Sequence, residues 1–564
     1  MAAQLASTSV HPISRSTSRP ANPRLASVAT ALPAHVAPQS ASRALAARAT
    51  IIETDGAYWA GLAAALERGD FRHGLSTAWP PLYPALISAA LRIARMAGLA
   101  PAPGTLEICA RAVSVVAGAL LLVPLYALAR RLLSPRAAVI AVTLAAVHPR
   151  TLQYSAAALS EATFTLLLLA ALALLVAREQ EAGAGRAGHA REASSGALFG
   201  LAYLARPEGL PLAAAIWITG IFRPPAAGPS TRRTPATRLR PAFALATLAV
   251  ALPWLLFLHG TLGRWSLGEK GEYNFWRAFA TEYAADYPAP AGLAARVNES
   301  PEIAPAAAAA GVHALAFTLR HPGDVIGRCA RNLLIILAST LPVTLYWPLV
   351  PFAVLALFGP RPRGAWPVAA TLGALPLLYA PFSVDRRFLV PAVPLLLIAC
   401  AAGFERAEAW LVTRSGSAQL ARSVANATVV MLVTLSIAYA FTKGAGFERA
   451  PEHRRAGEWL RGAEAGARTD GVAREIRRPI VMSRKPWVAF YAGGLIAALP
   501  EAGPDSLIAL ARARGAVLVA DERSARADRT GLAPLLDPAA APAGLRVLHR
   551  EPGPPALVLY GPGP

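Results

Sequence analysis

Charged residues and cysteines are scarce in this sequence of 564 residues. Asp, Glu, Lys and Arg make up only 16% of it, against about 25% in an ordinary globular domain, while hydrophobic residues make up 55%. This balance excludes a soluble multidomain protein. The three cysteines (Cys109, Cys329 and Cys400) are an odd number without metal-ligand spacing, so they indicate neither a disulfide framework nor a zinc site.

Lysine is nearly absent as well. Lys270, Lys443 and Lys485 are the only three, so arginine carries almost all of the positive charge. A formal net charge of +22 is compatible with a nucleic-acid partner. The arginines, however, lie largely in short gaps between apolar blocks, where the positive-inside rule places them. We therefore expect a membrane-embedded protein with no nucleic-acid partner.

Ten apolar segments approach the ~20 residues that a membrane-spanning helix needs. They lie at 112–133, 137–148, 161–177, 196–206, 209–222, 242–259, 333–358, 365–381, 387–403 and 422–441. Residues 1–50 contain no convincing span; the stretch 25–42 is compatible with a degenerate first helix, a signal-like segment or a disordered arm. We favour a degenerate or missing first helix, and predict a polytopic α-helical membrane protein with about 10–11 transmembrane helices.

Five clusters of arginine predict how these helices are oriented. They lie at 130–136, 178–191, 223–240, 361–363 and 406–422. Placing all five in the cytoplasm gives one consistent topology, in which the loops 51–111 and 260–332 and everything after residue 442 face outward. The predicted organisation is an N-terminal arm or degenerate helix at 1–50, a transmembrane module at 51–442 and an extracytoplasmic domain at 443–564.

The tail changes in character after about residue 445. Its sequence is charged and punctuated by Pro and Gly, with amphipathic helix signals at 454–461 and 506–514. Four short apolar runs are typical of buried strands, at 479–482, 516–520, 545–548 and 556–560. We predict a small α/β domain.

The first external loop carries a candidate catalytic carboxylate. Tyr58, Leu62 and Leu66 recur at helical spacing and predict an amphipathic helix over 57–68, lying on the membrane surface. Asp55 stands directly before it. The position is compatible with a helix N-cap and equally with a general base at the water–lipid boundary, and spacing alone does not decide.

Two further charged features lie on the predicted outer side. Glu161 opens an apolar helix, where the helix dipole favours a carboxylate, but an acidic group at this depth is costly unless it faces a polar cavity. Arg386 and Arg387 lie between two apolar helices. They are compatible with snorkelling to the interface, but a phosphate ligand explains cations on this side better.

The order of these motifs resembles the GT-C superfamily of integral-membrane glycosyltransferases. The most similar branch contains bacterial relatives of the protein mannosyltransferases and of the lipid A aminoarabinose transferases. The resemblance covers roughly residues 50–405. It is carried by Asp55-Gly-Ala-Tyr58, Pro80-Pro81-Leu82-Tyr83-Pro84, His148-Pro149, Leu159-Ser160-Glu161, Arg206-Pro207-Glu208 and Arg387-Phe388-Leu389.

This resemblance implies an inverting transfer of sugar from a polyprenyl-phosphate donor to an acceptor hydroxyl. The reaction would take place on the outer face of the bacterial cytoplasmic membrane, with a lipid, glycan or protein as acceptor. It implies no certain cofactor and leaves a divalent metal open. It implies Asp55 as the base and Glu161 as a second acidic residue in the same cavity. Arg387 and Arg386 would bind the donor phosphate, and the substrate cavity would contain Tyr58, Tyr83 and His148.

The family's paired acidic residues correspond here to Glu53 and Asp55, with Thr54 between them, so Glu53 is the alternative base. Chemistry is consistent with this function, because a polyprenyl phosphate leaves as a stable anion and one carboxylate and one cation suffice. A lipid-linked sugar transporter or flippase is the first alternative; it predicts an internal repeat and polar residues near the midplane, and neither is evident. A non-catalytic membrane scaffold leaves the outer Asp, Glu and Arg unexplained.

Overall fold

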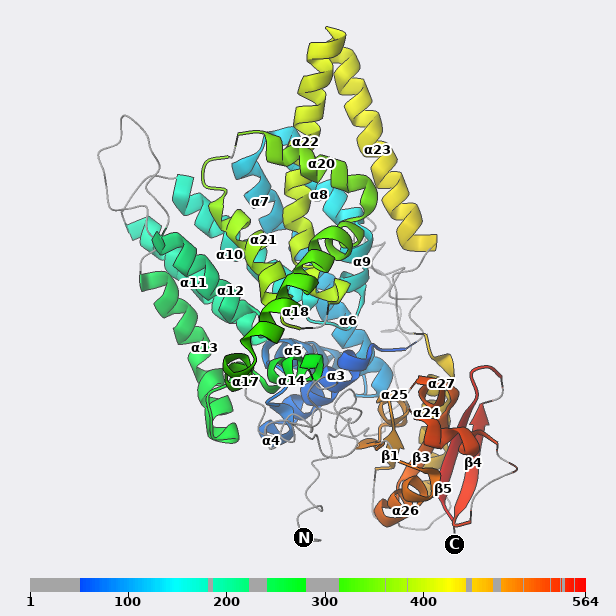
Figure 1. Ribbon diagram of the computed structural model, residues 1–564. Coiled ribbons are helices and arrows are strands. Elements are labelled where there is room, and N and C mark those ends of the chain that lie inside the picture. The colour runs from blue at the N-terminus through cyan, green and yellow to red at the C-terminus, as the bar shows by residue number, and fades with distance from the viewer. Residues whose placement is uncertain are drawn as a thin grey trace.

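A bundle of helices forms most of the molecule, and a small domain with a β-sheet lies beside one end of it (Figure 1). The computed structural model describes residues 51–180, 186–222, 241–279, 314–442, 449–469 and 478–563, apart from positions 361, 383, 501, 528, 538, 540–542 and 552. The predicted fold class is confirmed. The expectations for residues 1–50 and for the cluster 223–240 lie outside the described residues.

Within these ranges, five helical stretches are long and apolar enough to cross a membrane. They are Pro103–Leu132 (α6 Pro103–Leu120, α7 Leu122–Leu132), α10 Glu161–Gln180, α13 Pro241–Leu262, Pro322–Leu345 (α18 Pro322–Ile335, η4 Ile336–Thr340, α19 Leu341–Leu345) and α23 Ala418–Thr442. Shorter apolar stretches are α8 Pro135–Val147, α12 Gly209–Phe222, Trp347–Phe358 (η5 Trp347–Leu349, α20 Val350–Leu355, η6 Ala356–Phe358) and α21 Trp366–Tyr379. Two other long helices of the bundle are α11 Arg186–Ala205 and α22 Ala392–Ser415.

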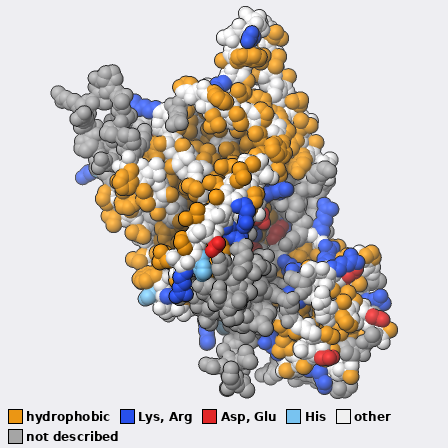
Figure 2. Space-filling view, viewed as in Figure 1, with side chains coloured by type: hydrophobic (Ala, Val, Ile, Leu, Met, Phe, Trp, Pro, Cys, Tyr) orange, Lys and Arg blue, Asp and Glu red, His pale blue; other side chains and the backbone are white. Residues whose placement is uncertain are grey.

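Hydrophobic side chains cover the visible face of the upper bundle, and charged side chains gather below, toward the C-terminal domain (Figure 2). Val123, Leu245 and Val430 are among the large apolar residues that stay exposed on the spanning helices. An apolar surface of this extent suits contact with lipid, because a soluble protein seldom exposes one.

The predicted span 333–358 is wrong in both boundary and continuity. The helix begins earlier, at Pro322, and ends at Leu345; Tyr346, with φ 75°, then turns the chain into a second helical stretch. Pro342 has no amide hydrogen to donate to the preceding turn, which weakens the helix just before the break. Hydropathy stays high across Tyr346, so the sequence pattern hides the interruption.

The helices α22 and α23 also extend further than predicted. The predicted span 387–403 begins too early, because residues 386–389 form a separate 3-10 turn and α22 starts at Ala392. The helix then continues to Ser415, and α23 begins at Ala418, so the two helices occupy most of the predicted loop 406–422. They form a hairpin that projects beyond the rest of the bundle (Figure 1). Gly416, with φ 67°, ends α22 in the left-handed conformation that glycine adopts without strain.

The described arginine clusters meet at one end of the bundle. The Gln180 side-chain amide donates to the backbone oxygens of Arg131 (2.6 Å) and Arg363 (3.0 Å). Arg136 pairs with Glu408 of α22 and donates to Asn426 of α23 (2.7 Å). The alternation of ends that the arginine pattern predicts is therefore present in the fold.

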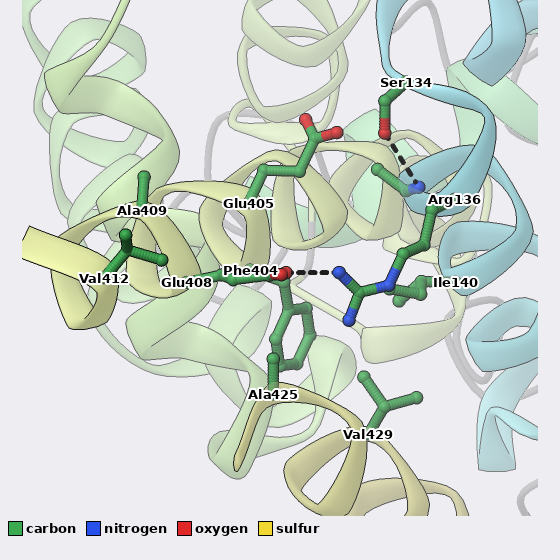
Figure 3. Close-up of a pocket in the computed structure, with 11 residues that line it drawn as sticks. Ser134, Arg136, Ile140, Phe404, Glu405, Glu408, Ala409, Val412, Ala425 and Val429 are labelled. Carbon is green, nitrogen blue, oxygen red and sulfur yellow. Dashed lines mark hydrogen bonds and ion pairs between the residues drawn. The ribbon is translucent and has the colours of Figure 1, made fainter. Parts of the chain in front are cut away.

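A pocket of about 300 Å³ lies at this basic end, between α8, α22 and α23 (Figure 3). The Arg136–Glu408 pair is part of its lining, and Phe404, Val412 and Val429 supply apolar walls. Arg136 and Glu408 bind each other across it, and Ser134 caps α8, so the pocket is a seam between helices.

Short helices fill the opposite end: α3 Thr54–Glu67, α4 Phe71–Gly74, α5 Leu82–Met96, α9 Pro149–Ala156, α14 Glu269–Phe279 and α17 Ala314–Arg320. The predicted helix over 57–68 is present as α3, but it is not an amphipathic surface helix. Every residue from Gly56 to Leu66 is buried. Its alanines and glycines allow close packing on all sides; a Cβ on Gly56 would lie 2.7 Å from the Ala158 carbonyl oxygen.

The C-terminal domain contains a five-stranded sheet of order β2-β1-β3-β5-β4, parallel from β2 to β3 and antiparallel beyond. Its elements are α24 Pro451–Thr469, β1 Ile480–Ser483, α25 Trp487–Ala492, β2 Leu495–Ala498, α26 Pro504–Arg514, β3 Val517–Asp521, α27 Glu522–Ala527, η8 Thr530–Leu536, β4 Leu545–Glu551 and β5 Leu557–Pro562. The four predicted strands correspond to β1, β3, β4 and β5. The short elements β2 and α25 are not predicted from the sequence.

Alternate residues of the sheet pack on opposite sides, as the twofold period of a strand requires. Val481, Val519 and Leu559 belong to a core that also contains Ile51, Ile52 and Ala57 of the membrane module. Met482, Leu518 and Tyr560 belong to a separate core with α26 and η8. One face of the sheet thus joins the domain to the bundle and the other completes the domain.

We expect the two ends of the bundle to lie on opposite sides of the membrane. In a variant without native cysteines, Arg72→Cys in α4 should react with a membrane-impermeant thiol reagent in intact cells. Ala418→Cys, at the start of α23, should react only after permeabilisation. Both positions are exposed. Labelling of both from the same side would contradict the topology.

Candidate active site

Asp55 lies in the first turn of α3, two residues after the N-cap position, which Glu53 occupies. The N-cap alternative for Asp55 is therefore wrong. The Asp55 carboxylate instead binds two cations: an Arg387 terminal nitrogen lies 2.6 Å from one oxygen, and Lys270 Nζ lies 3.4 Å from the other. The positive end of the helix dipole adds to this field.

Arg387 lies in a short 3-10 turn, η7 Arg386–Leu389. The Asp385 carboxylate caps this turn by accepting from the Arg387 backbone N–H (2.8 Å). Asn332 of α18 holds the preceding chain by donating to the carbonyls of Ala380 (2.8 Å) and Phe382 (2.7 Å). With the backbone fixed, the Arg387 guanidinium donates to Asp55 through one nitrogen and to Glu161 through Nε.

Glu161 extends this contact into a chain of alternating charges. Its side chain is fully buried at the start of α10 and also accepts from Arg206 (2.7 Å). Arg206 pairs with Glu208 (2.8 Å), which accepts from the Tyr379 hydroxyl (2.9 Å). Three cations alternate with three carboxylates, so every buried charge has an opposite neighbour. They run in the order Lys270, Asp55, Arg387, Glu161, Arg206 and Glu208. Pairing of this kind offsets part of the cost of burying charge.

The cations set the protonation of Asp55. Burial by itself would raise the pKa of this carboxyl, but the charges of Lys270 and Arg387 outweigh burial and hold the pKa well below its usual range. Burial lowers the pKa of Lys270 to about 8, although Asp55 acts in the other direction. Asp55 is thus ionised at neutral pH, with both oxygens bound.

An aromatic group adjoins Lys270. Its ammonium lies 3.4 Å from the centre of the Trp79 ring, and Tyr58 stacks on the same tryptophan with ring centres 6.2 Å apart. Tyr58 is one turn after Asp55 on α3. Through this tryptophan, Tyr58 adjoins the charged chain at Lys270.

Tyr83 and His148 occupy structural positions. The Tyr83 hydroxyl donates to the Ala110 carbonyl (2.9 Å) and contacts Ser114 (2.8 Å). His148 caps α9: its Nδ1 accepts from the Arg150 N–H (3.2 Å), and its Nε2 therefore donates to the Leu345 carbonyl (3.0 Å). Both side chains are buried, and neither contacts the charged chain through a hydrogen bond described here.

Glu53 belongs to a second buried network. One of its oxygens pairs with Arg111 (3.3 Å) and the other accepts from the Ala158 N–H (2.8 Å). Arg111 also pairs with Glu107 (3.2 Å). Arg386, in contrast, is exposed and makes no hydrogen bond or ion pair described in the structure. Of the residues predicted for catalysis and phosphate binding, the fold brings together Asp55, Glu161 and Arg387, and leaves Glu53 and Arg386 apart.

Several buried polar atoms around Glu161 have no hydrogen-bond partner within the described part of the chain. They are Glu161 Oε2, Ser160 Oγ, Thr163 Oγ1, Arg206 Nε and Glu208 Oε2. Unsatisfied buried polar atoms are rare in proteins, and their concentration here suits a site that takes a polar ligand. Among the described residues, no three His, Cys, Asp or Glu side chains lie together as potential metal ligands.

Sequence analysis missed Lys270 and Trp79 and gave no site role to Arg206, Glu208 and Tyr379. The sequence carries a signal for three of them. Lys270 is one of three lysines in an arginine-rich chain. Arg206 and Glu208 flank a proline between two apolar helices, where charge is otherwise absent. Trp79 and Tyr379 carry no such signal, because aromatic residues are common both in membrane proteins' helices and at their interfaces with water.

The fold, taken alone, is that of the GT-C superfamily, because solved glycosyltransferases share it. ArnT from Cupriavidus metallidurans matches over 96% of this chain and 99% of its own, with a TM-score of 0.54 at 15% identity in the apo state. The same protein bound to undecaprenyl phosphate gives 0.53 at 14% identity. The archaeal oligosaccharyltransferase AglB from Archaeoglobus fulgidus, in complex with an inhibitory peptide and a dolichol-phosphate, gives 0.50 at 14% identity, over 86% of this chain and 69% of its own.

A narrower relationship appears in the sequence. Residues 79–257 match the model of the dolichyl-phosphate-mannose-protein mannosyltransferase family. No curated protein is significantly similar to the chain in sequence. The resemblance to the GT-C superfamily is thus confirmed, and the family match contains Glu161, Arg206 and Glu208.

We expect Glu53→Gln to lower stability. The substitution removes the charge that faces Arg111 in a buried network, and a hydrogen bond to a charged group contributes about 1.5–3 kcal/mol. Thermal unfolding in detergent measures the loss. Glu458→Gln, which removes a charge facing Arg454 in a pair whose two side chains are both partly exposed, is the matched control and should change little. A stable Glu53→Gln protein without transferase activity would make Glu53 the base.

Proposed function

We propose that this protein transfers a sugar from a polyprenyl-phosphate donor to an acceptor hydroxyl, with inversion at the anomeric carbon. The observation that carries the proposal is the contact between Asp55 and Arg387. A carboxylate and a guanidinium lie side by side at one end of a membrane bundle whose fold matches a protein bound to undecaprenyl phosphate. These two groups are what such a reaction needs from a protein.

Arg387 and Lys270 would bind the donor phosphate. Arginine presents a planar fork that matches phosphate oxygens, and the ammonium of Lys270 adds a point charge from the other side of Asp55. The departing polyprenyl phosphate is a stable anion, so the cations stabilise the leaving group and no general acid is required.

Asp55 would act as the base. It would accept the proton of the acceptor hydroxyl while the acceptor oxygen attacks the anomeric carbon and the bond to the phosphate oxygen breaks. A positioned base contributes typically ~10²–10⁴-fold to rate. Attack from the face opposite the phosphate inverts the anomeric centre.

Donor binding would also activate the base. Without donor, both oxygens of Asp55 are bound by cations, which makes it a weak base. A donor phosphate competes for the same guanidinium and ammonium. When it draws them away, the pKa of Asp55 rises toward its usual range, so basicity develops only in the loaded site.

The proposed location is the outer face of the cytoplasmic membrane of a bacterium. The charged chain lies at the end of the bundle opposite the arginine clusters, which the positive-inside rule places in the cytoplasm. A sugar on that outer side must arrive on a lipid carrier. The alternative function, transport, would favour charged residues near the midplane of the membrane. The charges described here gather at one end of the bundle.

Asp55→Asn should abolish sugar transfer and leave the protein folded. Asparagine keeps the size of the side chain and removes its basicity, and we expect kcat to fall at least ~100-fold. Transfer from a polyprenyl-phosphate sugar in reconstituted vesicles is the measurement. Asp70→Asn is a suitable control, because Asp70 caps the exposed helix α4 and asparagine caps equally well. Persistent activity in Asp55→Asn would overturn its assignment as the base.

Arg387→Ala should weaken donor binding by roughly 10–100-fold, the usual range for a hydrogen bond to a charged group. Arg387→Lys should be intermediate, since it keeps the charge and loses the fork. Binding of polyprenyl phosphate to the purified protein can be followed by isothermal titration in detergent. Arg386→Ala, its exposed neighbour, should bind normally. Equal affinity in Arg387→Ala and the unmodified protein would rule out the phosphate role.

A further inference from the structure

The C-terminal domain is packed directly against the chain that carries Asp55. Its short helix α25 is buried along its whole length and contacts α3 and α6 of the membrane module. Trp487, Phe490 and Tyr491 of α25 share one hydrophobic core with Ile51 and Ile52. The domain therefore contacts the segment preceding Asp55 directly.

The Tyr491 side chain crosses this interface beside a second polar link, in which Arg454 of α24 pairs with Glu107 (3.5 Å). The Tyr491 hydroxyl accepts from the Ile52 backbone N–H (2.8 Å) and donates to Glu107 Oε2 (3.0 Å), and the tyrosine is 1% exposed. A hydroxyl has one proton to donate, and Glu107 receives it. Neither Ile52 nor Tyr491 can move far without leaving a buried polar group unpaired.

The contact continues into the buried network around Arg111. Glu107 pairs with Arg111, whose guanidinium donates to the carbonyl oxygens of Ile51 (2.8 Å) and Ala156 (3.1 Å). Glu53 pairs with Arg111 and accepts from the Ala158 N–H. One arginine therefore holds two segments, of which one leads from Ile51 to Asp55 and the other from Ala156 to Glu161.

We propose that the C-terminal domain is part of the active-site scaffold, and that Tyr491 is a positioning residue for Asp55. Tyr491 fixes the backbone at Ile52, and Glu107 and Arg111 pass the constraint to the chain before Glu161. The Asp55 carboxylate is thereby held against Arg387. The proposal rests on the proposed function only in making Asp55 the group whose position matters for turnover.

A single pair of variants tests this scaffold. Tyr491→Phe keeps the buried ring and removes the hydroxyl. Tyr560→Phe is the matched control: Tyr560 is equally buried in the same domain, its hydroxyl donates to the Leu535 carbonyl (2.8 Å), and it belongs to the core on the other face of the sheet. Tyr491→Phe loses two buried hydrogen bonds, both to the membrane module, whereas Tyr560→Phe loses one within the domain.

Hydrogen exchange of the full chain in detergent, read by mass spectrometry, is the first measurement. Tyr491→Phe should raise exchange in peptides covering residues 51–58 and 156–161, whereas Tyr560→Phe should raise it only around η8 and β5. This readout does not depend on glycosyl transfer. If the unmodified protein proves to transfer no sugar, the proposed function fails and the scaffold is still tested.

Steady-state kinetics is the second measurement. Displacement of a catalytic group by about 1 Å can cost ~100-fold in rate, so kcat of Tyr491→Phe should fall roughly 10–100-fold. Donor affinity should change far less than kcat, because the Arg387 backbone is held by Asp385, outside the network around Arg111. Tyr560→Phe should keep both values.

The scaffold would be overturned if folded Tyr491→Phe kept the unmodified exchange pattern and kcat, or if only its donor affinity changed. Should Tyr491→Phe fail to fold, Glu107→Gln weakens the same link from the membrane side while keeping an acceptor oxygen for the tyrosine. Glu107→Gln should then show the same local rise in hydrogen exchange near residues 51–58. Unchanged exchange there would likewise overturn the proposal.

Discussion

The Arg387 guanidinium, shared between Asp55 and Glu161, is the contact on which the rest of the site depends. It joins three parts of the chain that are far apart in sequence: the first external helix, the start of α10 and the turn before α22. Removal of the arginine would leave two buried or half-buried carboxylates facing each other. Such repulsion is costly at this depth, so the arginine both holds the fold together and tunes the candidate base.

A second buried arginine, Arg111, has a comparable structural role in the neighbouring network. Arg111 binds backbone carbonyls and two carboxylates, none of which belongs to the charged chain. The two arginines have different roles. Arg387 contacts the group proposed to react, and Arg111 fixes the segments that carry that group. Glu53 and Asp55, only two residues apart, consequently belong to different networks. Their adjacency in the sequence conceals this difference.

Much of the architecture could be predicted from the sequence, because lipid imposes simple rules on composition. Apolar blocks and arginine clusters predict the bundle and the grouping of its ends, and apolar runs in the tail predict four of the five strands. The interruption at Tyr346 could not be predicted, since hydropathy is continuous across it. The burial of α3 could not be predicted either, because alanine and glycine suit a surface and a tightly packed interior equally well.

The candidate site divides along a similar line. Asp55, Glu161 and Arg387 were identified through motif order. Lys270 and the pair Arg206–Glu208 complete the chain only in space, with partners that lie tens or hundreds of residues away. A sequence pattern records which residue types are present but not which distant charges neutralise one another. The Tyr491 hydroxyl is the extreme case, since its bond partner Ile52 lies 439 residues earlier.

The balance of charge along the chain from Lys270 to Glu208 has a consequence for selectivity. Three positive and three negative groups cancel, so the resting site exerts little net attraction on the small anions and phospholipid headgroups around it. An anion can bind one of these cations only by displacing the carboxylate paired with it. A weakly binding or badly shaped anion therefore gains no binding free energy. Neutrality at rest would thus act as a filter, keeping the site free in a membrane crowded with other phosphates.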